Sequence, residues 1–234
     1  MSNAMFLRVG IDKGCGRALA PIFEDGSFEY IPIPEIDPNS TESRTYKNTI
    51  GRSGRSFAYY LPQRISNNPM HYDPEFEFFT YGDVKSKRKY LLKLDKDDLL
   101  VFYAGLKPFK NSKFDEALYI IGYFTINRII DFNQLNKSEK EVTSFLYQNN
   151  AHIKRSYSYQ DLVIVVGDKN KSCLLDKAVP ISSRKFDKRG RSYHAVSPVI
   201  EEQLGITGSI QRSIPPRIIK NDDNLINLRR ILKI

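Results

Sequence analysis

The reactive side chains that stand closest together in the sequence are one imidazole and two carboxylates, His71, Asp73 and Glu75, all within five residues. Such groups can divide the roles of general acid and general base between them. Asp12, near the N-terminus, is a further carboxylate that could face the same pocket. The alternative is that Asp73 and Pro74 start a turn and the acids are incidental. Asp12, His71, Asp73 and Glu75 are therefore candidate catalytic residues, with both interpretations open.

The same group could hold a divalent metal only with ligands from distant parts of the chain. Asp12, His152 or His194 would have to converge on it, and nothing in the local sequence requires this. The two cysteines, Cys15 and Cys173, are too few and too far apart for a zinc site of their own. The sequence therefore assigns no metal ligand and leaves any cofactor unknown.

Two short segments combine basic and aromatic residues; the first begins at Lys85 and the second at Arg184. Arginine matches phosphate in a bidentate way, and neighbouring aromatic rings offer faces on which an exposed base can stack. The alternative is a solvated turn, above all at residues 188–191, which could form the tip of a hairpin. The candidate nucleic-acid contacts in these segments are Lys87, Arg88, Arg184, Lys185, Lys188, Arg189, Arg191, Tyr193 and His194.

Two glycine-containing loops, residues 10–17 and 51–56, could also hold a phosphate through backbone N–H groups. The first loop lacks both the dinucleotide-binding spacing and the Lys-Ser/Thr ending of a P-loop. A tight connection and a mobile surface loop are the respective alternatives. The candidate contacts from these loops, and from a basic segment nearer the C-terminus, are Lys13, Arg17, Arg52, Arg55 and Arg212.

The overall charge favours a polyanionic partner. The chain has 36 lysines and arginines against 27 aspartates and glutamates, for a formal net charge of +9. Such an excess attracts nucleic acid, because neutralised phosphates release condensed counterions, although a generally basic proteome would also produce it. No apolar run approaches the roughly 20 residues of a membrane-spanning helix, so no membrane partner is expected. The charge does not separate DNA from RNA and says nothing about oligomeric state.

Two cysteines in 234 residues exclude a disulfide framework and favour a reducing, cytoplasmic location. Residues 2–4, Ser-Asn-Ala ahead of Met5, are typical of an expression-vector remnant. We therefore expect residues 1–4 to be foreign and residues 5–234 to form a single elaborated domain. With 41% hydrophobic residues, a chain of this length can bury a core.

The elements that must position these side chains are mostly short strands. Apolar or alternating runs predict strands at residues 5–11, 28–33, 99–103, 117–130 and 161–167. Capping and dipole patterns predict helices starting near Ser138 and Pro198 and over residues 222–233. A strand interrupted at Gly122 would accommodate a bulge there. The pattern predicts a β-rich α+β fold, a bent sheet or barrel with peripheral helices.

Residues 96–105, Lys-Asp-Asp-Leu-Leu-Val-Phe-Tyr-Ala-Gly, together with residues 119–126, resemble the core hairpin of the PUA/EVE/ASCH superfamily of small β-barrels. Asp97 replaces the glycine of the usual Gly-Asp pair. The resemblance implies a PUA-like core over roughly residues 95–182. Relatives of this kind generally bind RNA or modified bases.

A second resemblance covers most of the chain. Residues 8–12, 21–34, 71–76 and 80–83 are similar to the start of the nucleotide modification associated domain 3 family. This resemblance implies a role in DNA hypermodification or nucleotide modification, without an established activity or catalytic residue.

The resulting hypothesis is a protein that binds nucleic acid, DNA or RNA, and holds a modified base or nucleotide. The alternative is an enzyme that acts on a nucleotide or DNA base through the four candidate catalytic residues. A third interpretation is a component of a larger complex whose basic surface binds acidic protein.

Overall fold

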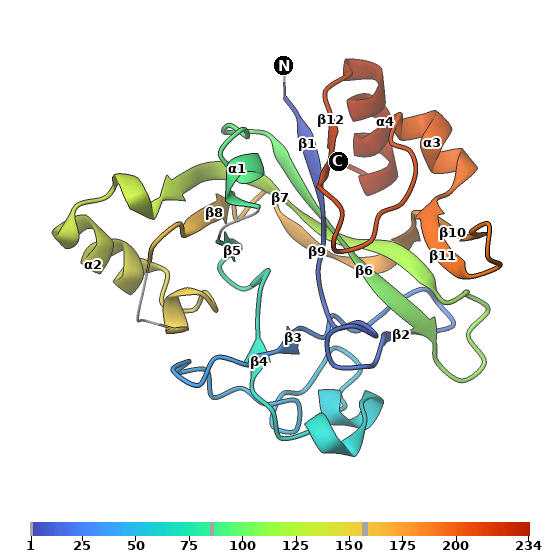
Figure 1. Cartoon of the computed structure of the whole chain (residues 1–234), viewed down its shortest axis with the longest axis horizontal. Coiled ribbons are helices and arrows are strands. Elements are labelled where there is room, and N and C mark those ends of the chain that lie inside the picture. Colours follow the sequence, from blue (N-terminus) through green and yellow to red (C-terminus); the bar gives the residue numbers. More distant parts are fainter. Residues whose placement is uncertain (1, 85–86, 156–158) are drawn as a thin grey trace.

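The sheet at the centre of the fold is built on two long strands, β6 (Leu99–Pro108) and β7 (Ala117–Asp131) (Figure 1). The computed structural model describes residues 2–84, 87–155 and 159–234, so Lys85 of the first basic segment lies outside the described residues. Within these ranges the strand order is β12-β1-β6-β7-β8-β5, with β2 on β6 and β9 on β7. The remaining strands of this sheet are β1 (Ala4–Arg8), β2 (Ala20–Ile22), β5 (Thr80–Asp83), β8 (Val163–Gly167), β9 (Cys173–Pro180) and β12 (Arg217–Ile219).

The central strands are where the apolar runs predicted them, although β6 extends further. Their pairing is antiparallel, and its register shifts next to Gly122. The pairing of β7 with β9 shifts at the same place, between Ile120 and Gly122. A bulge there was predicted from the glycine. It gives the sheet its bend, because a bulged strand turns more sharply than a regular one.

Strand β1 pairs in parallel with β6 and antiparallel with β12. The backbone N–H of Asn3 also donates to the Asp98 carboxylate at 2.5 Å. The predicted strand over residues 5–11 is thus confirmed in its first part. The chain then leaves the sheet at Gly10. Its φ of +71° favours glycine, and a Cβ atom added there would lie only 3.3 Å from the Ile31 carbonyl oxygen.

The predicted strand over residues 28–33 is wrong. Only β3 (Ile33–Pro34) forms there, paired with β4 (Met70–His71), and Phe28 makes a single bridge with Ile22. Pro32 and Pro34 cannot donate backbone hydrogen bonds, which limits pairing in this segment. The chain instead continues as irregular loops with two short 3₁₀ helices, η1 (Phe57–Tyr60) and η2 (Gln63–Ile65).

Helices cover only parts of the periphery. Helices α3 (Pro198–Leu204) and α4 (Asp222–Leu232) pack on one face of the sheet, where Leu204 and Leu228 join a buried cluster with Phe6. The loops that follow β2 cover the opposite face. The shorter or more distant helices are α1 (Arg88–Leu91), α2 (Lys137–Leu146), η3 (Phe132–Gln134) and η4 (Ile153–Arg155).

Helix ends test the capping predictions. Ser197 caps α3 by accepting from the Ile200 N–H, and Gly205 ends that helix in the left-handed region, as predicted. The predicted cap of α2 at Ser138 is wrong, because Asn136 caps the helix and forms a capping box with Glu139. Both choices satisfy the same sequence spacing, which is why the pattern alone did not separate them.

The architecture is therefore an open, strand-rich α+β fold with peripheral helices, which confirms the predicted fold class and favours a bent sheet over a closed barrel. None of the helices in the described ranges has the length and apolar character needed to cross a bilayer.

A buried ion-pair group ties the irregular loops to the region after α2. The Glu42 carboxylate, 1% exposed, accepts from Arg44 at 2.7 Å and from Lys154 at 2.9 Å. Burial favours a higher pKa, but these hydrogen bonds outweigh it and lower the pKa of Glu42 from 4.5 to about 2. The ionised form is therefore more stable in the folded protein than in the unfolded chain.

The lowered pKa of Glu42 predicts that the folded protein is less stable in acid. Stability contributed by Glu42 is present above pH 4.5 and is lost as the pH falls toward 2, since its folded pKa is the lower one. Glu42→Gln should lower the free energy of unfolding by about 2 kcal/mol at pH 6, and by much less at pH 3. Urea denaturation at several pH values measures the free energy of unfolding of the wild-type protein and of the variant. An equal loss at pH 3 and pH 6 would contradict this origin of the stability.

Candidate nucleic-acid interface

A cavity of about 670 Å³ lies where segments from the two ends of the chain meet. Its walls come from the glycine loop after β1, the facing ends of β6 and β7, the hairpin of β10 (Ser182–Phe186) and β11 (Ser192–Val196), and the segment after α3. The residues that line it are Arg8, Asp12, Lys13, Gly14, Cys15, Leu19, Gly105, Glu116, Ala117, Leu118, Arg184, Ser192, Tyr193, His194, Gln211, Arg212 and Ser213.

Asp12 anchors the floor of this cavity. Its Oδ1 accepts from the backbone N–H groups of Gly14 and Cys15, both at 2.8 Å, which closes the glycine loop into a tight turn. Its Oδ2 accepts from Arg212 Nε at 3.0 Å. Burial raises the pKa of Asp12, but the charge and hydrogen bond of Arg212 outweigh it, so the net pKa is lowered. An ionised carboxylate with both oxygens engaged stabilises the loop and is poorly placed to act as a general base.

Arg212 connects the C-terminal part of the chain to this loop. Besides Asp12, its guanidinium donates to the carbonyl oxygens of Arg8 at 3.3 Å and Gly10 at 2.5 Å. Nearby, the Tyr103 hydroxyl donates to the carbonyl oxygen of Ile210 at 2.9 Å. These bonds fix the segment after α3 against the end of β1 and so shape one wall of the cavity.

The rim carries groups of both signs. Lys13 forms an ion pair with Glu116, whereas Arg184 has no acidic partner within ion-pair distance in the described part of the chain. Burial, together with the charge of Arg184, lowers the pKa of His194, whose Nδ1 lies 3.4 Å from Ser182 Oγ. The cavity therefore combines a neutral imidazole with a guanidinium that is free to bind an anion.

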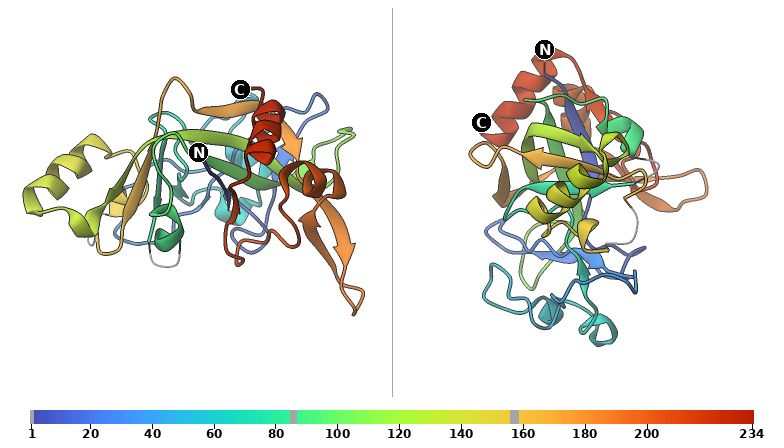
Figure 2. Two further views of the ribbon diagram at one scale, coloured as in Figure 1. Left: turned by 90° about the horizontal axis from the view of Figure 1, so that it is seen from above. Right: turned by 90° about the vertical axis from the view of Figure 1, so that its left-hand side faces the viewer.

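The hairpin of β10 (Ser182–Phe186) and β11 (Ser192–Val196) extends beyond the body of the molecule (Figure 2). The Asp187 carboxylate closes its tip by accepting from the backbone of Arg189 at 2.8 Å and from Arg191 Nε at 2.8 Å. Lys188 and Arg189 stand exposed at that tip. Residues 188–191 thus form a hairpin tip, the arrangement that the sequence offered as an alternative at this place.

Residues of the hairpin alternate between its two faces. Arg184 pairs with His194, and Phe186, 67% exposed, follows on the same face. Lys185 pairs with Tyr193 on the other face, where its ammonium lies 3.5 Å from Glu201 of α3. Phe186 is consequently the aromatic residue of β10 that shares a face with the Arg184 guanidinium. Tyr193 contributes to the cavity wall.

Other predicted contacts lie outside the cavity lining and are held by local partners. Arg52 donates to the Leu175 carbonyl oxygen at 2.5 Å, and Arg55 stacks on the ring of Tyr59 at 4.4 Å. Lys87 and Arg88 form ion pairs at 3.4 and 2.5 Å, with Asp83 and Asp131 respectively. Arg17 is exposed beside the glycine loop. The structure therefore brings Lys13, Arg184, Tyr193, His194 and Arg212 together and leaves these five elsewhere.

The candidate catalytic residues do not form one site. His71, Asp73 and Glu75 are buried, and none of them lines the cavity that contains Asp12. Glu75 is fully buried, with its pKa raised by burial, and its carboxylate accepts from the N–H groups of Glu77 and Phe78. It thus stabilises its own turn. The expectation that Asp12 joins the other three in a single pocket is wrong, because hydrogen bonds hold Asp12 in the cavity wall whereas the other three residues are buried away from it.

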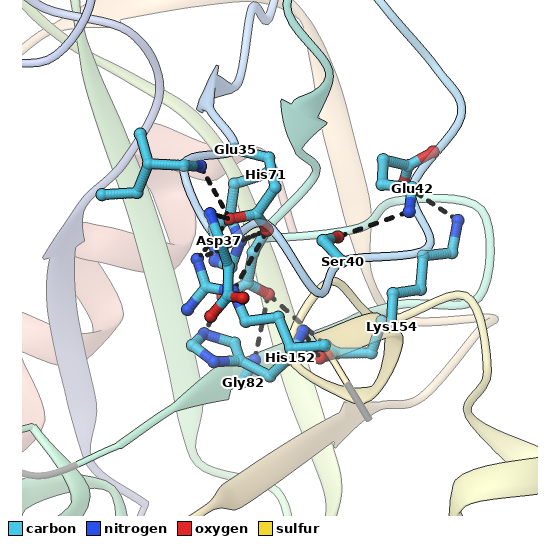
Figure 3. A network of polar contacts seen from close by, with 12 residues as sticks. Glu35, Asp37, Ser40, Glu42, His71, Gly82, His152 and Lys154 are labelled. Carbon is cyan, nitrogen blue, oxygen red and sulfur yellow. Dashed lines mark hydrogen bonds and ion pairs between the residues drawn. The ribbon is translucent and has the colours of Figure 1, made fainter. Parts of the chain in front are cut away.

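His71 instead belongs to an interior polar network (Figure 3), and Asp73 lies beside it, with Oδ2 3.5 Å from His152 Nε2. His71 Nδ1 lies 2.9 Å from the Glu35 carboxylate, and Arg155 donates to the same carboxylate at 2.8 Å. His152 lies next to both, with its ring 4.7 Å from that of His71. Convergence of His152 on this group was weighed in the sequence, but no local signal pointed to Glu35 or Arg155.

Residues 3–212 match the family described as nucleotide modification associated domain 3. The chain belongs to this family. The resemblance seen in the opening segments is thereby confirmed over nine-tenths of the length, and the family description links the chain to nucleotide modification. No curated protein sequence matches it.

Among solved structures, the N-terminal domain of Thermococcus gammatolerans McrB bound to m5C DNA is similar to this family member with 12% identity. The alignment covers 99% of this chain and 98% of that chain, with a TM-score of 0.34. A score of this size does not indicate a common fold, so the PUA-like core expected over residues 95–182 stays a prediction.

Three residues of the interface had no sequence signal strong enough to single them out as site residues. Arg8 ends the first strand, and Glu116 precedes β7. Gln211 precedes the arginine that clamps the glycine loop. Only the folded chain places these residues around one cavity, because the segments that carry them are far apart in the sequence.

Proposed function

We propose that this protein binds nucleic acid with the β10–β11 hairpin and the adjacent cavity, and that the cavity accepts a single base or nucleotide. The observation that carries the proposal is the meeting of basic groups from three distant segments, at Lys13, Arg184 and Arg212, around one cavity beside an exposed basic hairpin. Membership of a nucleotide-modification family supports a modified base or nucleotide as the occupant.

The hairpin supplies the groups that hold the backbone of the nucleic acid. Lys188 and Arg189 at its tip are exposed and have no acidic partner within ion-pair distance among the described residues. Phosphates bound there would release counterions, which gives affinity without sequence preference. Phe186, on the same face as Arg184, offers its ring to an unpaired base.

The cavity supplies the groups that recognise one nucleotide. Its volume of about 670 Å³ falls in the range of small-molecule pockets, which run from roughly 300 to 1,000 Å³. Arg184 can pair with a phosphate or with the acceptor edge of a base, and the His194 imidazole can donate or accept one hydrogen bond. A base that has left its stack could therefore insert between the glycine loop and the hairpin.

The hairpin cations give the first test. Lys188→Ala with Arg189→Ala should weaken binding to duplex oligonucleotides about tenfold and reduce the slope of log affinity against log salt by about 2. Each side chain neutralises one phosphate, so the loss should not depend on sequence. Fluorescence anisotropy of labelled oligonucleotides across a salt series measures affinity and slope together.

A matched control removes the same charge elsewhere. Lys137→Ala with Lys140→Ala alters α2, at the opposite end of the molecule from the hairpin (Figure 1), and should leave affinity and slope nearly unchanged. In the same assay Phe186→Ala should weaken single-strand binding about tenfold at constant slope, since stacking involves no counterion. Equal effects of the two double variants, or no binding by the wild-type protein at low salt, would overturn the proposal.

A further inference from the structure

Two histidines and an aspartate meet in the interior of the fold, away from the cavity. They are His71 of β4, Asp73 two residues later, and His152, which precedes η4. One ligand atom from each lies within 4.8 Å of the others. His71 is 6% exposed, Asp73 9%, and the side chain of His152 11%. These side chains are thus gathered below the surface, although they come from segments about 80 residues apart in the sequence.

Asp73 is held by neutral donors. Its Oδ1 accepts from the Gly82 N–H at 2.9 Å and lies 3.5 Å from the Asn150 amide nitrogen. Asn150 is fully buried, and its own Oδ1 accepts from the backbone N–H of His152 at 2.9 Å. One asparagine therefore positions both Asp73 and His152. The remaining oxygen, Oδ2, faces His152.

The distance between the Asp73 carboxylate and the His152 imidazole is close to that of two ligands on one metal ion. Asp73 Oδ2 and His152 Nε2 lie 3.5 Å apart, which is long for a charge-assisted hydrogen bond. Two ligands that each stand about 2.0–2.1 Å from a tetrahedral metal are separated by roughly 3.4 Å. The observed separation is compatible with two ligands sharing one ion, and the ligand atoms of all three residues already lie within 4.8 Å of one another.

Glu35 orients that third ligand. Its carboxylate can only accept and lies 2.9 Å from His71 Nδ1, closer than the donor Arg155 Nη2 at 3.1 Å, so we assign the ring hydrogen to that nitrogen. The lone pair of neutral His71 is then on Nε2. Glu35 is itself fixed by Arg155, at 2.8 Å, and by the backbone N–H of Asp37, at 2.9 Å. A carboxylate behind a ligating imidazole is the usual outer shell of a metal-bound histidine.

We propose that His71, Asp73 and His152 bind one divalent first-row transition-metal ion, with Glu35 as the positioning residue behind His71. Two imidazole nitrogens and one carboxylate oxygen suit zinc, iron, cobalt or nickel, whereas magnesium and calcium prefer oxygen ligands alone. Three protein ligands leave a coordination position for water or another small ligand. The proposal stands independently of nucleic-acid binding, because none of these residues lines the cavity.

The competing explanation is a buried ion pair between protonated His152 and Asp73. Metal binding to the intact protein separates the two. After treatment with a chelator and buffer exchange, the wild-type chain is titrated with Zn²⁺ by calorimetry, and metal content after desalting is measured by elemental analysis. We expect one tightly bound ion per chain. Co²⁺ should give visible absorption bands typical of a mixed nitrogen–oxygen site. Less than a tenth of an ion per chain after reconstitution would overturn the proposal.

Variants locate the site. His152→Gln and Asp73→Asn should each abolish stoichiometric binding, and circular dichroism checks that each variant is folded. Glu35→Gln should weaken Zn²⁺ binding about 10- to 100-fold, the usual effect of an outer-shell partner. Glu42→Gln is the matched control, because Glu42 is an equally buried carboxylate of the same loop that contacts Arg44 and Lys154 and neither histidine ligand. Unchanged affinity in a folded Asp73→Asn protein, or equal weakening by the two glutamine variants, would also overturn it.

Discussion

Replacing Arg212 with methionine is expected to lower the free energy of unfolding by about 3 kcal/mol at neutral pH. The guanidinium holds Asp12 at 3.0 Å and the carbonyl oxygens of Arg8 and Gly10. Methionine keeps much of the aliphatic bulk but removes every donor. Asp12, whose side chain is 8% exposed, would keep only Arg8, at 3.5 Å, as an ion-pair partner among the described residues. Leaving a buried charge poorly paired is costly, and urea denaturation at neutral pH measures the loss.

A double-mutant cycle tests that cause. Asp12→Asn removes the charge that Arg212 neutralises, so the double variant should be more stable than the sum of the two single losses predicts, by about 1–2 kcal/mol. Strictly additive losses would show that Arg212 acts through its carbonyl contacts alone. A loss below about 0.5 kcal/mol for the single methionine variant would contradict its role as the clamp of the cavity wall.

Gly122→Ala is expected to cost about 3 kcal/mol. A Cβ at this position would lie 2.7 Å from the Cys173 carbonyl oxygen and 2.7 Å from a ring carbon of Phe76. Neither neighbour can yield cheaply, since one belongs to the backbone of the paired strand β9 and the other is an aromatic ring packed against Phe102 and Phe124. Thermal or urea unfolding measures the effect.

Gly105→Ala is the matched control in the neighbouring strand β6. Its Cβ would meet a methyl carbon of Leu19 at 2.9 Å, and a flexible side-chain end can move away. We expect a loss below about 1 kcal/mol for this variant, because only a rotamer has to change. Equal losses for the two alanine variants would mean that the bulge at Gly122 tolerates a side chain and that the cost is one of backbone freedom alone.

The parts of the fold that the sequence predicts are those set by local patterns. The apolar runs of β6 and β7, and the Ser197 cap and Gly205 end of α3, each act within a few positions. The strand expected at residues 28–33 fails for a local reason too, since its prolines cannot complete a ladder. The sequence also predicted the family correctly, because the resemblance depends on short motifs that follow one another along the chain.

The site depended on contacts that no local pattern encodes. Arg212 and Asp12 are 200 residues apart, and Glu35 and Arg155 are 120 apart. Charge counts identified Arg184 and the hairpin tip as basic but could not say that Lys87 and Arg88 would be held by their own acids. Burial was equally hidden: His71, Asp73 and Glu75 look like an exposed polar turn in sequence and are interior residues in the fold.

The position of β1 between β6 and β12 has a consequence for how the chain is made. Met5 pairs with Leu100 on one side and with Ile218 on the other. During translation this strand must therefore wait for roughly a hundred residues to leave the ribosome before its first neighbour exists. Its other edge stays open until roughly two hundred further residues, up to β12, have emerged. A prematurely terminated product would keep an unprotected strand edge and lack the arginine clamp, which makes it a target for chaperones or for self-association.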